Sequence, residues 1–596
     1  MREICCDVLV IGAGGGALRA AIAACETNPE LKVQIVTRGK FGKSGVTATA
    51  CSDRMAFHAT LPYTEPGGED NWRYHADDIY RIGGYVSDPE LAEILAKNSG
   101  KAAMDLVEYG VPFVRDAEGK LDQFITDGSD YARACYTGPY TANHISQALC
   151  RKVEELGLPV LEEHYVFQLA VADGKVAGAW VQPERLPSSE DPKDHLLLIR
   201  AGAVILATGG AGEIYGRNAY PPGTMGDGYA MAVEAGASLV NMEFMQFTLV
   251  SPKTKLACSG SIMRAMPCFV NDKGEELSLP GNWPELIFAK GATYPISFEK
   301  ATHKIDLLVA RELEAGGRVY LDYSTNPKGF AWEKLSQRLR SLYRTEQTLD
   351  LGKQREESPL VRLKEINQPV IQWLAERGVD LEAGDLLEVH PVVQHFQGGV
   401  WINSRAETKL PGLFAVGEVA GGQHGANRPG GNALLDCQVF GRIAGENAAQ
   451  LAGKQRCCTR RDLPEPSFPR EGNGSLPARE VLERVRSLMD RYAAVIRWKE
   501  GLEAAEKELG ALREVDIIPG TDSWDKVIEA RTARVVASAI VKAQAMRRES
   551  RGPHLYFDSP EGDPRPTDPK YQRSICLTGP ELVPSWIRWQ DEEEEE

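Results

Sequence analysis

The segment 7–17 reads Asp-Val-Leu-Val-Ile-Gly-Ala-Gly-Gly-Gly-Ala and sets the fold class of this 596-residue chain. Its apolar half predicts a buried strand, and residues 12–17 follow the spacing Gly-x-Gly-x-x-Ala. This spacing allows a tight turn, lets a pyrophosphate approach the backbone, and points a helix N-terminus at the phosphates. Glycine-rich turns also simply join strands to helices. Here a helix-forming stretch at 18–26 and a second apolar run at 32–36 complete the unit, so we predict a dinucleotide site.

The second strand ends at Thr37-Arg38, where an Asp or Glu usually holds the adenosine ribose, so a common NAD site is disfavoured. Residues 203–210 form another buried strand running into a small-residue turn, and a third such strand follows at 413–417. Strands of one type that are far apart in sequence imply one Rossmann-like domain interrupted by an insertion.

The expected fold class is α/β, with a Rossmann-like domain, an α+β capping domain inserted into it, and a C-terminal helical domain. The nucleotide-binding domain takes residues 1–250 and 388–455, and the capping domain takes 251–387. A Pro-, Gly- and Ser-rich stretch precedes the helical domain at 475–553, and a C-terminal extension with an acidic tail covers 554–596.

Helical periodicity supports this division. The capping domain contains predicted helices at about 305–315 and 363–377. Apolar residues at three-and-four spacing between 481 and 492, and again between 527 and 543, predict helices that pack as a bundle.

The formal net charge of −16 argues against nucleic acid or an anionic membrane as the main partner. The twelve cysteines include the pairs Cys5-Cys6 and Cys457-Cys458 but no Cys-x-x-Cys, so neither a zinc site nor a cysteine-ligated iron–sulfur cluster is encoded. The first strand begins by Asp7, which leaves no room for a signal peptide, and no apolar run is long enough to span a bilayer. We expect a cytoplasmic protein without direct membrane insertion and without a bound metal.

A second glycine-rich motif follows the third strand. Residues 413–418 read Leu-Phe-Ala-Val-Gly-Glu, and residues 424–436 read His-Gly-Ala-Asn-Arg-Pro-Gly-Gly-Asn-Ala-Leu-Leu-Asp. The turn offers backbone N–H groups to an anion, and Arg428 offers a guanidinium to a substrate carboxylate.

Taken in order, the motifs of this chain resemble the succinate dehydrogenase/fumarate reductase flavoprotein family, from about residue 7 to residue 554. The segments that carry the resemblance are 12–17, 108–113, 207–210, 226–228, 243–247, 424–436 and 548–554. The resemblance implies an FAD cofactor lying extended, with its pyrophosphate at Gly12 to Ala17 and its isoalloxazine near Asn432 to Leu435.

The same resemblance implies the cofactor contacts. Asp227 and Glu418 would hold ribityl or ribose hydroxyls, because carboxylates accept hydrogen bonds from hydroxyls. Asp227 is alternatively an ordinary helix N-cap. The residues implied to bind FAD are Gly12, Gly14, Gly15, Gly16, Ala17, Thr37, Arg38, Lys43, Ser44, Gly45, Thr47, Ala207, Thr208, Gly209, Asp227, Glu418, Asn432, Leu434 and Leu435.

The chain departs from the family at the flavin attachment point. In respiratory members a Ser-His-Thr segment supplies a histidine that bonds covalently to the flavin. The matching stretch here reads Lys43-Ser44-Gly45-Val46-Thr47, with Gly45 in the place of the histidine. We therefore predict non-covalent FAD.

The substrate side departs as well. The family's Gln-Phe-His-Pro is Gln-Phe-Thr-Leu at 246–249, and its Thr-Glu-x-x-Arg-Gly-Glu-Gly-Gly loop is replaced by the more apolar segment 260–268. Where the family uses an Arg to protonate carbon, this chain has Thr302-His303-Lys304. Loss of a positioned acid typically costs about 10²–10⁴ in rate, which argues against efficient succinate or fumarate chemistry. His303 or Lys304 could substitute, although a surface position is the alternative for Lys304.

Two substrate-site elements are retained. Arg428 keeps the place of the family's carboxylate-binding Arg, and His395 falls close to the family's pocket histidine. His390 is a second candidate for that role, and a histidine before a Gly-Gly turn can also be purely structural. The predicted catalytic residues are thus Arg428, His395, Lys304 and His303.

The preferred function is an FAD-dependent oxidoreductase subunit that exchanges hydride with a small anionic substrate and passes electrons to a ferredoxin-like iron–sulfur partner. One alternative is an electron-transfer subunit of a larger redox complex without its own organic substrate. Another is a fumarate reductase or L-aspartate oxidase-like enzyme with a substituted proton donor.

Overall fold

The computed structural model describes residues 2–589, apart from 53–54, 127–128, 280, 282, 293–294, 332, 334, 338–339, 341–357, 455–462, 467 and 469–474. The acidic tail and the Cys457-Cys458 pair lie outside the described residues.

The predicted strands meet in one sheet with the order β5-β2-β1-β8-β7-β6, and β16 pairs with β8. Strands β1, β2, β5, β8 and β16 run parallel, whereas β6 and β7 continue the sheet as an antiparallel hairpin. The strand bounds are β1 (Arg2–Ile11), β2 (Val33–Val36), β5 (Val160–Leu161), β6 (His164–Ala172), β7 (Lys175–Pro183), β8 (Leu197–Leu206) and β16 (Leu413–Ala415). The sequence-distant strands thus form the single interrupted Rossmann-like domain that the motifs predict.

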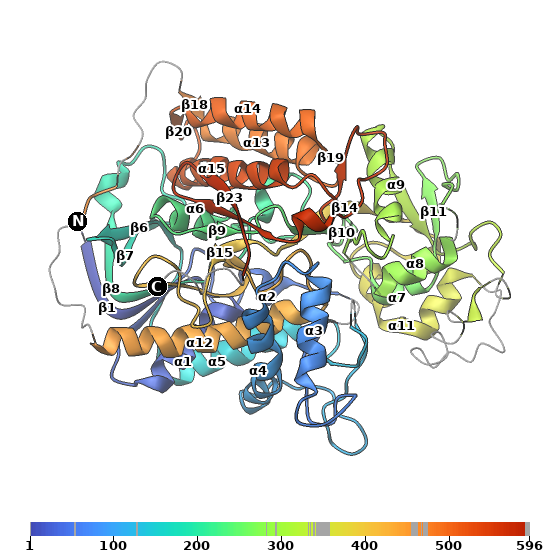
Figure 1. The fold of residues 1–596 in the computed structure, drawn as a ribbon, viewed down its shortest axis with the longest axis horizontal. Helices are drawn as coiled ribbons and strands as arrows, with labels where there is room; N and C mark the ends of the chain where they lie inside the picture. The colour runs from blue at the N-terminus through green and yellow to red at the C-terminus, as the bar shows by residue number, and fades with distance from the viewer. Residues whose placement is uncertain are drawn as a thin grey trace.

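Helices α1 (Gly15–Thr27), α5 (Thr141–Glu155) and α12 (Asn432–Lys454) lie together along one face of this sheet (Figure 1). Helices α1 and α12 approach closely because α12 carries glycines at the contact. A Cβ at Gly445 would lie 2.2 Å from the carbonyl oxygen of Ala20. This close packing fixes the start of α12 beside the turn between β1 and α1.

The capping domain stands apart at the right of Figure 1 and has its own core, which includes Phe269, Leu321 and Leu363. Its three-stranded antiparallel sheet is covered by helices, among them the two that periodicity predicts. The elements are α7 (Gly260–Arg264), β11 (Cys268–Asn271), α8 (Trp283–Ala292), α9 (His303–Glu314), β12 (Val319–Asp322), α11 (Pro359–Ala375) and β13 (Leu387–Glu388).

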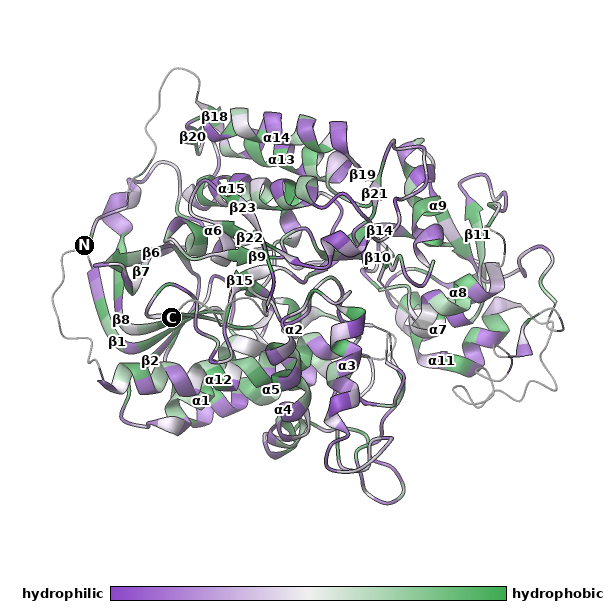
Figure 2. Ribbon diagram, viewed as in Figure 1, coloured by the Kyte–Doolittle hydropathy of each residue, from purple (hydrophilic) through white to green (hydrophobic). Residues whose placement is uncertain are grey.

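The helical domain consists of α13 (Ala478–Tyr492), α14 (Lys499–Arg513) and α15 (Trp524–Met546). Helices α13 and α14 carry both green and purple segments in Figure 2, the mixed colouring of amphipathic helices. Val485 and Ile540, both at predicted core positions, are fully buried. The predicted bundle is confirmed.

The segment that the sequence analysis sets apart as an extension returns to the nucleotide-binding domain. Its strands β22 (Ser574–Thr578) and β23 (Val583–Ile587) continue a sheet formed by β9 (Leu239–Val240), β15 (Gly399–Trp401) and β17 (Ala420–Gly421). Just before it, Arg547 donates to Glu243 at 2.8 Å and to Glu549 at 3.0 Å, with all three side chains fully buried. The motif at 548–554 therefore belongs to a buried network that fastens the helical domain to the Rossmann-like domain.

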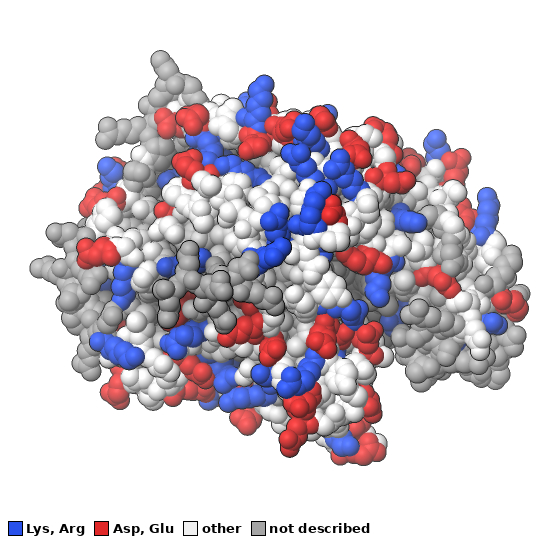
Figure 3. Space-filling model, in the orientation of Figure 1, with Lys and Arg blue, Asp and Glu red and all other residues white. Residues whose placement is uncertain are grey.

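On the face shown in Figure 3, Lys and Arg alternate with Asp and Glu, so the acidic excess is not gathered there into one patch. Among the described residues, every helix is too short or too polar to cross a membrane.

Candidate functional site

A cavity of about 850 Å³ extends from the turn after β1 to the capping domain. Ligand pockets commonly measure roughly 300–1,000 Å³, so this one has the size of a cofactor site. Both glycine-rich motifs, the end of β2 and the first helix of the capping domain line it. The predicted residues on its wall are Gly12, Gly14, Gly15, Gly16, Thr37, Arg38, Ser44, Gly45, Thr47, Ala207, Thr208, Gly209, Asp227, His395, Glu418, Arg428 and Leu434.

The turn after β1 has the geometry of a phosphate cradle. Gly12 adopts φ +118°, and a Cβ there would lie 2.3 Å from the Ala207 carbonyl oxygen, so only glycine fits. Helix α1 begins next to it, and its Gly14 N-cap provides no side-chain cap. The positive end of the helix dipole is thereby left open towards the cavity, where it suits a pyrophosphate.

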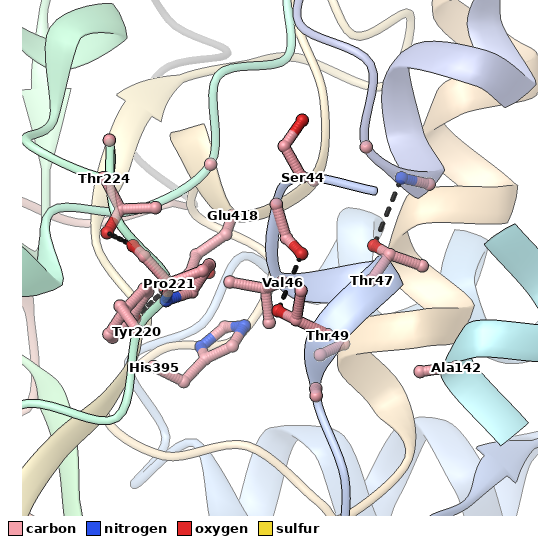
Figure 4. A pocket seen from close by; sticks show the side chains of 18 of the residues that line it. Ser44, Val46, Thr47, Thr49, Ala142, Tyr220, Pro221, Thr224, His395 and Glu418 are labelled. Carbon is pink, nitrogen blue, oxygen red and sulfur yellow. Dashed lines mark hydrogen bonds between the residues drawn. The ribbon is translucent and has the colours of Figure 1, made fainter. Parts of the chain in front are cut away.

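The segment 44–49 forms the neighbouring wall. The backbone N–H of Gly15 donates to Thr47 Oγ1 at 3.1 Å, which joins the cradle to short helix α2 (Val46–Thr49) (Figure 4). Gly45 has φ +86°, and a Cβ at this position would meet nothing within 4 Å. No nucleophilic side chain occupies the position at which the family carries its flavin-linked histidine.

Glu418 lies on the cavity wall opposite this segment (Figure 4). It accepts hydrogen bonds from the Tyr220 hydroxyl and from the Phe396 backbone N–H, the latter at 2.9 Å. Burial raises the pKa of Glu418 to about 7, and these two hydrogen bonds act in the opposite direction. A buried carboxyl with remaining lone pairs can accept hydrogen bonds from ligand hydroxyls.

Asp227 lines the far end of the cavity as the first residue of α6 (Asp227–Glu234). It accepts a hydrogen bond from the Tyr165 hydroxyl at 2.5 Å, and burial raises its pKa to about 6. The N-cap position of this helix is Gly226, and no side chain forms a capping hydrogen bond there. The geometry therefore does not support the alternative role of Asp227 as an ordinary N-cap.

His395 reaches the cavity from β14 (His390–Phe396), a strand paired with β10 (Met245–Val250). Gln397 Nε2 lies 3.0 Å from His395 Nδ1. Burial, reinforced by Arg428 and His424, lowers the pKa of His395 well below its usual value. His395 is therefore a neutral imidazole on the cavity wall, with one nitrogen that donates and one that accepts. His390 pairs instead with Glu388 at 3.0 Å.

Arg428 is buried in the glycine-rich loop and lines the same cavity. Its Nη2 donates to Gln246 Oε1 at 3.0 Å, and its Nη1 donates to the Pro429 carbonyl at 3.0 Å. Both contacts fix the plane of the guanidinium. A fixed guanidinium can bind a carboxylate with defined geometry.

The capping domain contributes Arg264, a residue that the sequence analysis does not single out. Arg264 ends helix α7, is 4% exposed and lines the cavity together with Ser259, Gly260 and Gly291. Its guanidinium lies 5.8 Å from the ring centroid of Phe288. The available signal was a single charge inside the apolar segment 260–268.

His303 and Lys304 are not on the cavity wall that the described residues form. His303 is the first residue of helix α9. Its imidazole ring stacks on Phe298, with the ring centroids 5.2 Å apart, and its Nδ1 lies 3.3 Å from the Ser297 carbonyl oxygen. Lys304 is exposed on the same helix. The register of α9 thus keeps both side chains away from the site.

Four predicted cofactor residues also lie off the wall: Ala17, Lys43, Asn432 and Leu435. Lys43 is exposed, whereas the others are fully buried behind the lining. Asn432 Oδ1 contacts His58 Nδ1 at 2.9 Å and His75 Nε2 at 3.2 Å. Asn432 therefore holds the start of α12 in place from behind.

Tyr220 is a second residue that the sequence analysis does not single out, and for this one the sequence gives no signal. It packs over the cavity beside Pro221 and reaches Glu418 across 198 positions of sequence (Figure 4). Only the fold brings these two side chains together.

Comparisons with known proteins agree with this geometry. Residues 7–434 match the family described as "FAD binding domain", and residues 482–578 match "Fumarate reductase flavoprotein C-term". The chain is 33% identical to a fumarate reductase (CoM/CoB) chain of Methanothermobacter marburgensis, covering 96% of this chain and 97% of that one. It is 30% identical to L-aspartate oxidase of Halobacterium salinarum, covering 94% and 98%.

Among solved structures, Sdh1 of Mycobacterium smegmatis superposes with a TM-score of 0.73 at 27% identity, covering 98% of this chain and 94% of that one. A dinucleotide fits this site, because the glycine turn can hold its phosphates and the acids on the cavity wall can accept hydrogen bonds from its hydroxyls. The chain belongs to the succinate dehydrogenase/fumarate reductase flavoprotein family and is an FAD-dependent oxidoreductase.

Proposed function

We propose that this protein is the flavoprotein subunit of an oxidoreductase that exchanges hydride with a small anionic substrate and shares electrons with a separate iron–sulfur protein. FAD supplies the hydride chemistry and can divide a two-electron event into single electrons. The names of two relatives specify fumarate and L-aspartate, and both molecules are carboxylates. These names support an anionic substrate for this chain.

The observation that carries the proposal is the pair of arginines on one cavity. Arg428 comes from the Rossmann-like domain and Arg264 from the capping domain, and both line the cavity that also contains the glycine cradle. Guanidinium groups match carboxylates in shape and charge, and two of them suit an anion with two acidic groups. A substrate bound by both would be held between the two domains.

His395 would orient this anion. Because its imidazole is neutral, it can donate one hydrogen bond without adding a charge. A neutral donor distinguishes substrates by the position of their acceptor atoms, whereas the two arginines distinguish them by their negative charge.

The wall also suggests how the chain holds its cofactor. Gly12 to Gly16 would bind the pyrophosphate, Glu418 and Asp227 would accept hydrogen bonds from hydroxyls, and Leu434 would lie near the isoalloxazine. The cavity lining supports each of these assignments.

The test of the substrate site is a pair of substitutions, Arg428→Ala and Arg264→Ala, in the FAD-loaded protein. Titration with fumarate, succinate and L-aspartate is followed through the visible flavin spectrum. We expect at least one of these anions to perturb the spectrum. Each substitution should weaken its binding roughly 10-fold to 100-fold, because a charged hydrogen bond contributes about 1.5–3 kcal/mol.

Two controls accompany the test. Arg405 is exposed and paired with Glu407, so Arg405→Ala should leave binding unchanged. Lys304→Ala should also leave it unchanged, because its side chain is exposed and off the cavity wall. If none of the anions binds, and Arg428→Ala retains dye-linked electron transfer, the protein is an electron-transfer subunit without its own substrate.

The partner is tested by purification from the native source without oxygen. We expect the chain to copurify with an iron-containing protein. Isolation as a lone chain that turns over with oxygen and forms peroxide would contradict this part of the proposal.

A further inference from the structure

The adenosine end of the cavity is lined by charged side chains and one tyrosine, which come from several parts of the chain. One of these parts is helix α15 of the C-terminal helical domain. The residues are Arg38 after β2, Tyr165 on β6, Glu184 after β7, Asp227 on α6, and Asp525 and Glu529 on α15.

Arg38 occupies a diagnostic position at the carboxyl end of β2. In dinucleotide-binding folds an acidic residue near this place accepts a ribose hydroxyl, whereas an Arg accommodates a 2′-phosphate. An Arg in this position would by itself favour a phosphorylated ribose.

In this fold the positive charge of Arg38 is already neutralised. Its Nε donates to both carboxylate oxygens of Glu184, each at 2.9 Å, and its Nη2 donates to Glu529 and lies 3.7 Å from Asp525. Its guanidinium also stacks on Tyr165, 4.1 Å from the ring centroid. The carboxylates and the ring hold Arg38 in one orientation.

Helix α15 also reaches Asp227, the ligand-facing acid of this region. A hydrogen bond from Thr532 on α15 stabilises the Asp227 carboxylate together with the hydroxyl of Tyr165. A carboxylate has about four lone-pair sites, so these two donors leave acceptor capacity for a ligand hydroxyl.

We propose that helix α15 is part of the FAD site: Glu529 positions Arg38 through its ion pair, and Asp227 is left to accept a hydrogen bond from an unphosphorylated adenosine ribose. A 2′-phosphate would lie beside the carboxylates of Asp227 and Glu184, which would repel it. The guanidinium of Arg38 would not compensate, because it is already paired with Glu184 and Glu529. Glu529 is thus a positioning residue for cofactor specificity, supplied by a domain outside the Rossmann-like fold.

The test measures ligand binding to the full-length protein after removal of FAD. The unsubstituted protein should bind AMP at least tenfold more tightly than adenosine 2′,5′-bisphosphate, which differs from AMP only by the 2′-phosphate. This comparison needs no variant, so it holds even if a substitution impairs folding. Equal or tighter binding of the 2′,5′-bisphosphate would overturn the proposal.

The variant Glu529→Gln removes the charge that holds Arg38 and keeps the size of the side chain. Its affinities for FAD and ADP should fall about tenfold or more, whereas its affinity for FMN, which lacks adenosine, should not change. The matched control is Glu480→Gln, which breaks an exposed ion pair with Arg484 on α13 of the same domain and should alter none of the three.

The comparison of FAD with FMN separates positioning from general damage. Unchanged FAD affinity in Glu529→Gln would overturn the proposal. A parallel loss of FAD and FMN affinity would also overturn it, because that result indicates only a structural role. None of these measurements uses the anionic substrate, so their outcome is independent of the proposed function.

Discussion

Gln246 and Arg428 hold each other in a reciprocal arrangement. Arg428 Nη2 donates to Gln246 Oε1 at 3.0 Å, while Gln246 Nε2 donates to the Arg428 carbonyl at 3.2 Å and to Asn427 Oδ1 at 2.7 Å. Gln246 lies on the strand that leads into the capping domain, and Arg428 lies in the glycine-rich loop. The orientation of the proposed anion-binding arginine therefore depends on a residue that is distant in sequence.

Replacing Gln246 with Leu removes these three hydrogen bonds with little change in volume. We expect a loss of about 1.5–3 kcal/mol in the free energy of unfolding, because one of the bonds involves a charged group. Urea denaturation measures this loss. Gln372→Leu, at an exposed position paired with Glu376, is the matched control and should change stability by less than about 0.5 kcal/mol. Equal stability of the two variants would show that the reciprocal contact contributes nothing.

Glu418 should make stability depend on pH. Its pKa is raised from 4.5 to about 7 in the fold, so the native state binds the proton more tightly than the unfolded chain. The stability that this carboxyl contributes is fully present below about pH 4.5 and is lost as the pH rises through 7. Glu418→Gln does not titrate. The free energy of unfolding of Glu418→Gln, measured relative to that of the unsubstituted protein, should therefore rise by up to about 3 kcal/mol between pH 5 and pH 8.

This comparison is made by denaturation of FAD-free protein at several pH values. Glu480→Gln, which removes a carboxyl from an exposed ion pair on α13, is the matched control for the substitution itself. A difference between Glu418→Gln and the unsubstituted protein that stays constant with pH would contradict this prediction.

Denaturation in acid should release the flavin from this protein. Because Gly45 stands where the family's flavin-linked histidine would be, FAD should be bound without a covalent bond. Precipitation in acid and centrifugation should leave the yellow colour in the supernatant. Flavin that remains in the washed pellet would mean that another side chain forms the bond.

Lys290 and Asp306 form an ion pair inside the capping domain. Their charged atoms lie 2.7 Å apart, and both side chains are fully buried. Asp306→Asn removes the counter-charge from a buried ammonium and should destabilise the protein by about 3–5 kcal/mol. The expected readout is earlier unfolding in urea and faster proteolysis within residues 251–387.

The control for this prediction is the exposed pair of Lys364 and Glu382 in the same domain. Glu382→Gln should cost no more than about 1 kcal/mol, since water screens the pair. The double variant Lys290→Met with Asp306→Leu should be more stable than Asp306→Asn, because it removes both charges of this pair and leaves no unpaired ammonium there. The reverse order would contradict the view that desolvation dominates at this site.

Much of the fold could be predicted from local sequence. The strand, turn and helix around Gly12 are set by residues within one short segment, because only glycine tolerates the backbone angle and the close approach to Ala207. The helices of the capping and helical domains follow from the spacing of apolar residues, which the packing then buries. The candidate carboxylate-binding Arg428 could also be predicted, since its glycine-rich motif follows a strand directly.

Local sequence was enough to predict the fold class and a dinucleotide site, and the resemblance of the motifs to a known family implied that the cofactor is FAD. Tertiary packing determines which capping-domain side chains reach the cavity: Arg264 lines it, and the register of α9 turns His303 and Lys304 away. Packing also brings Glu529 of the helical domain onto Arg38, whose charge it neutralises. The physical reason is that local motifs depend on backbone geometry between neighbouring residues. Contacts across hundreds of residues instead depend on how whole elements pack, and no local pattern records that packing.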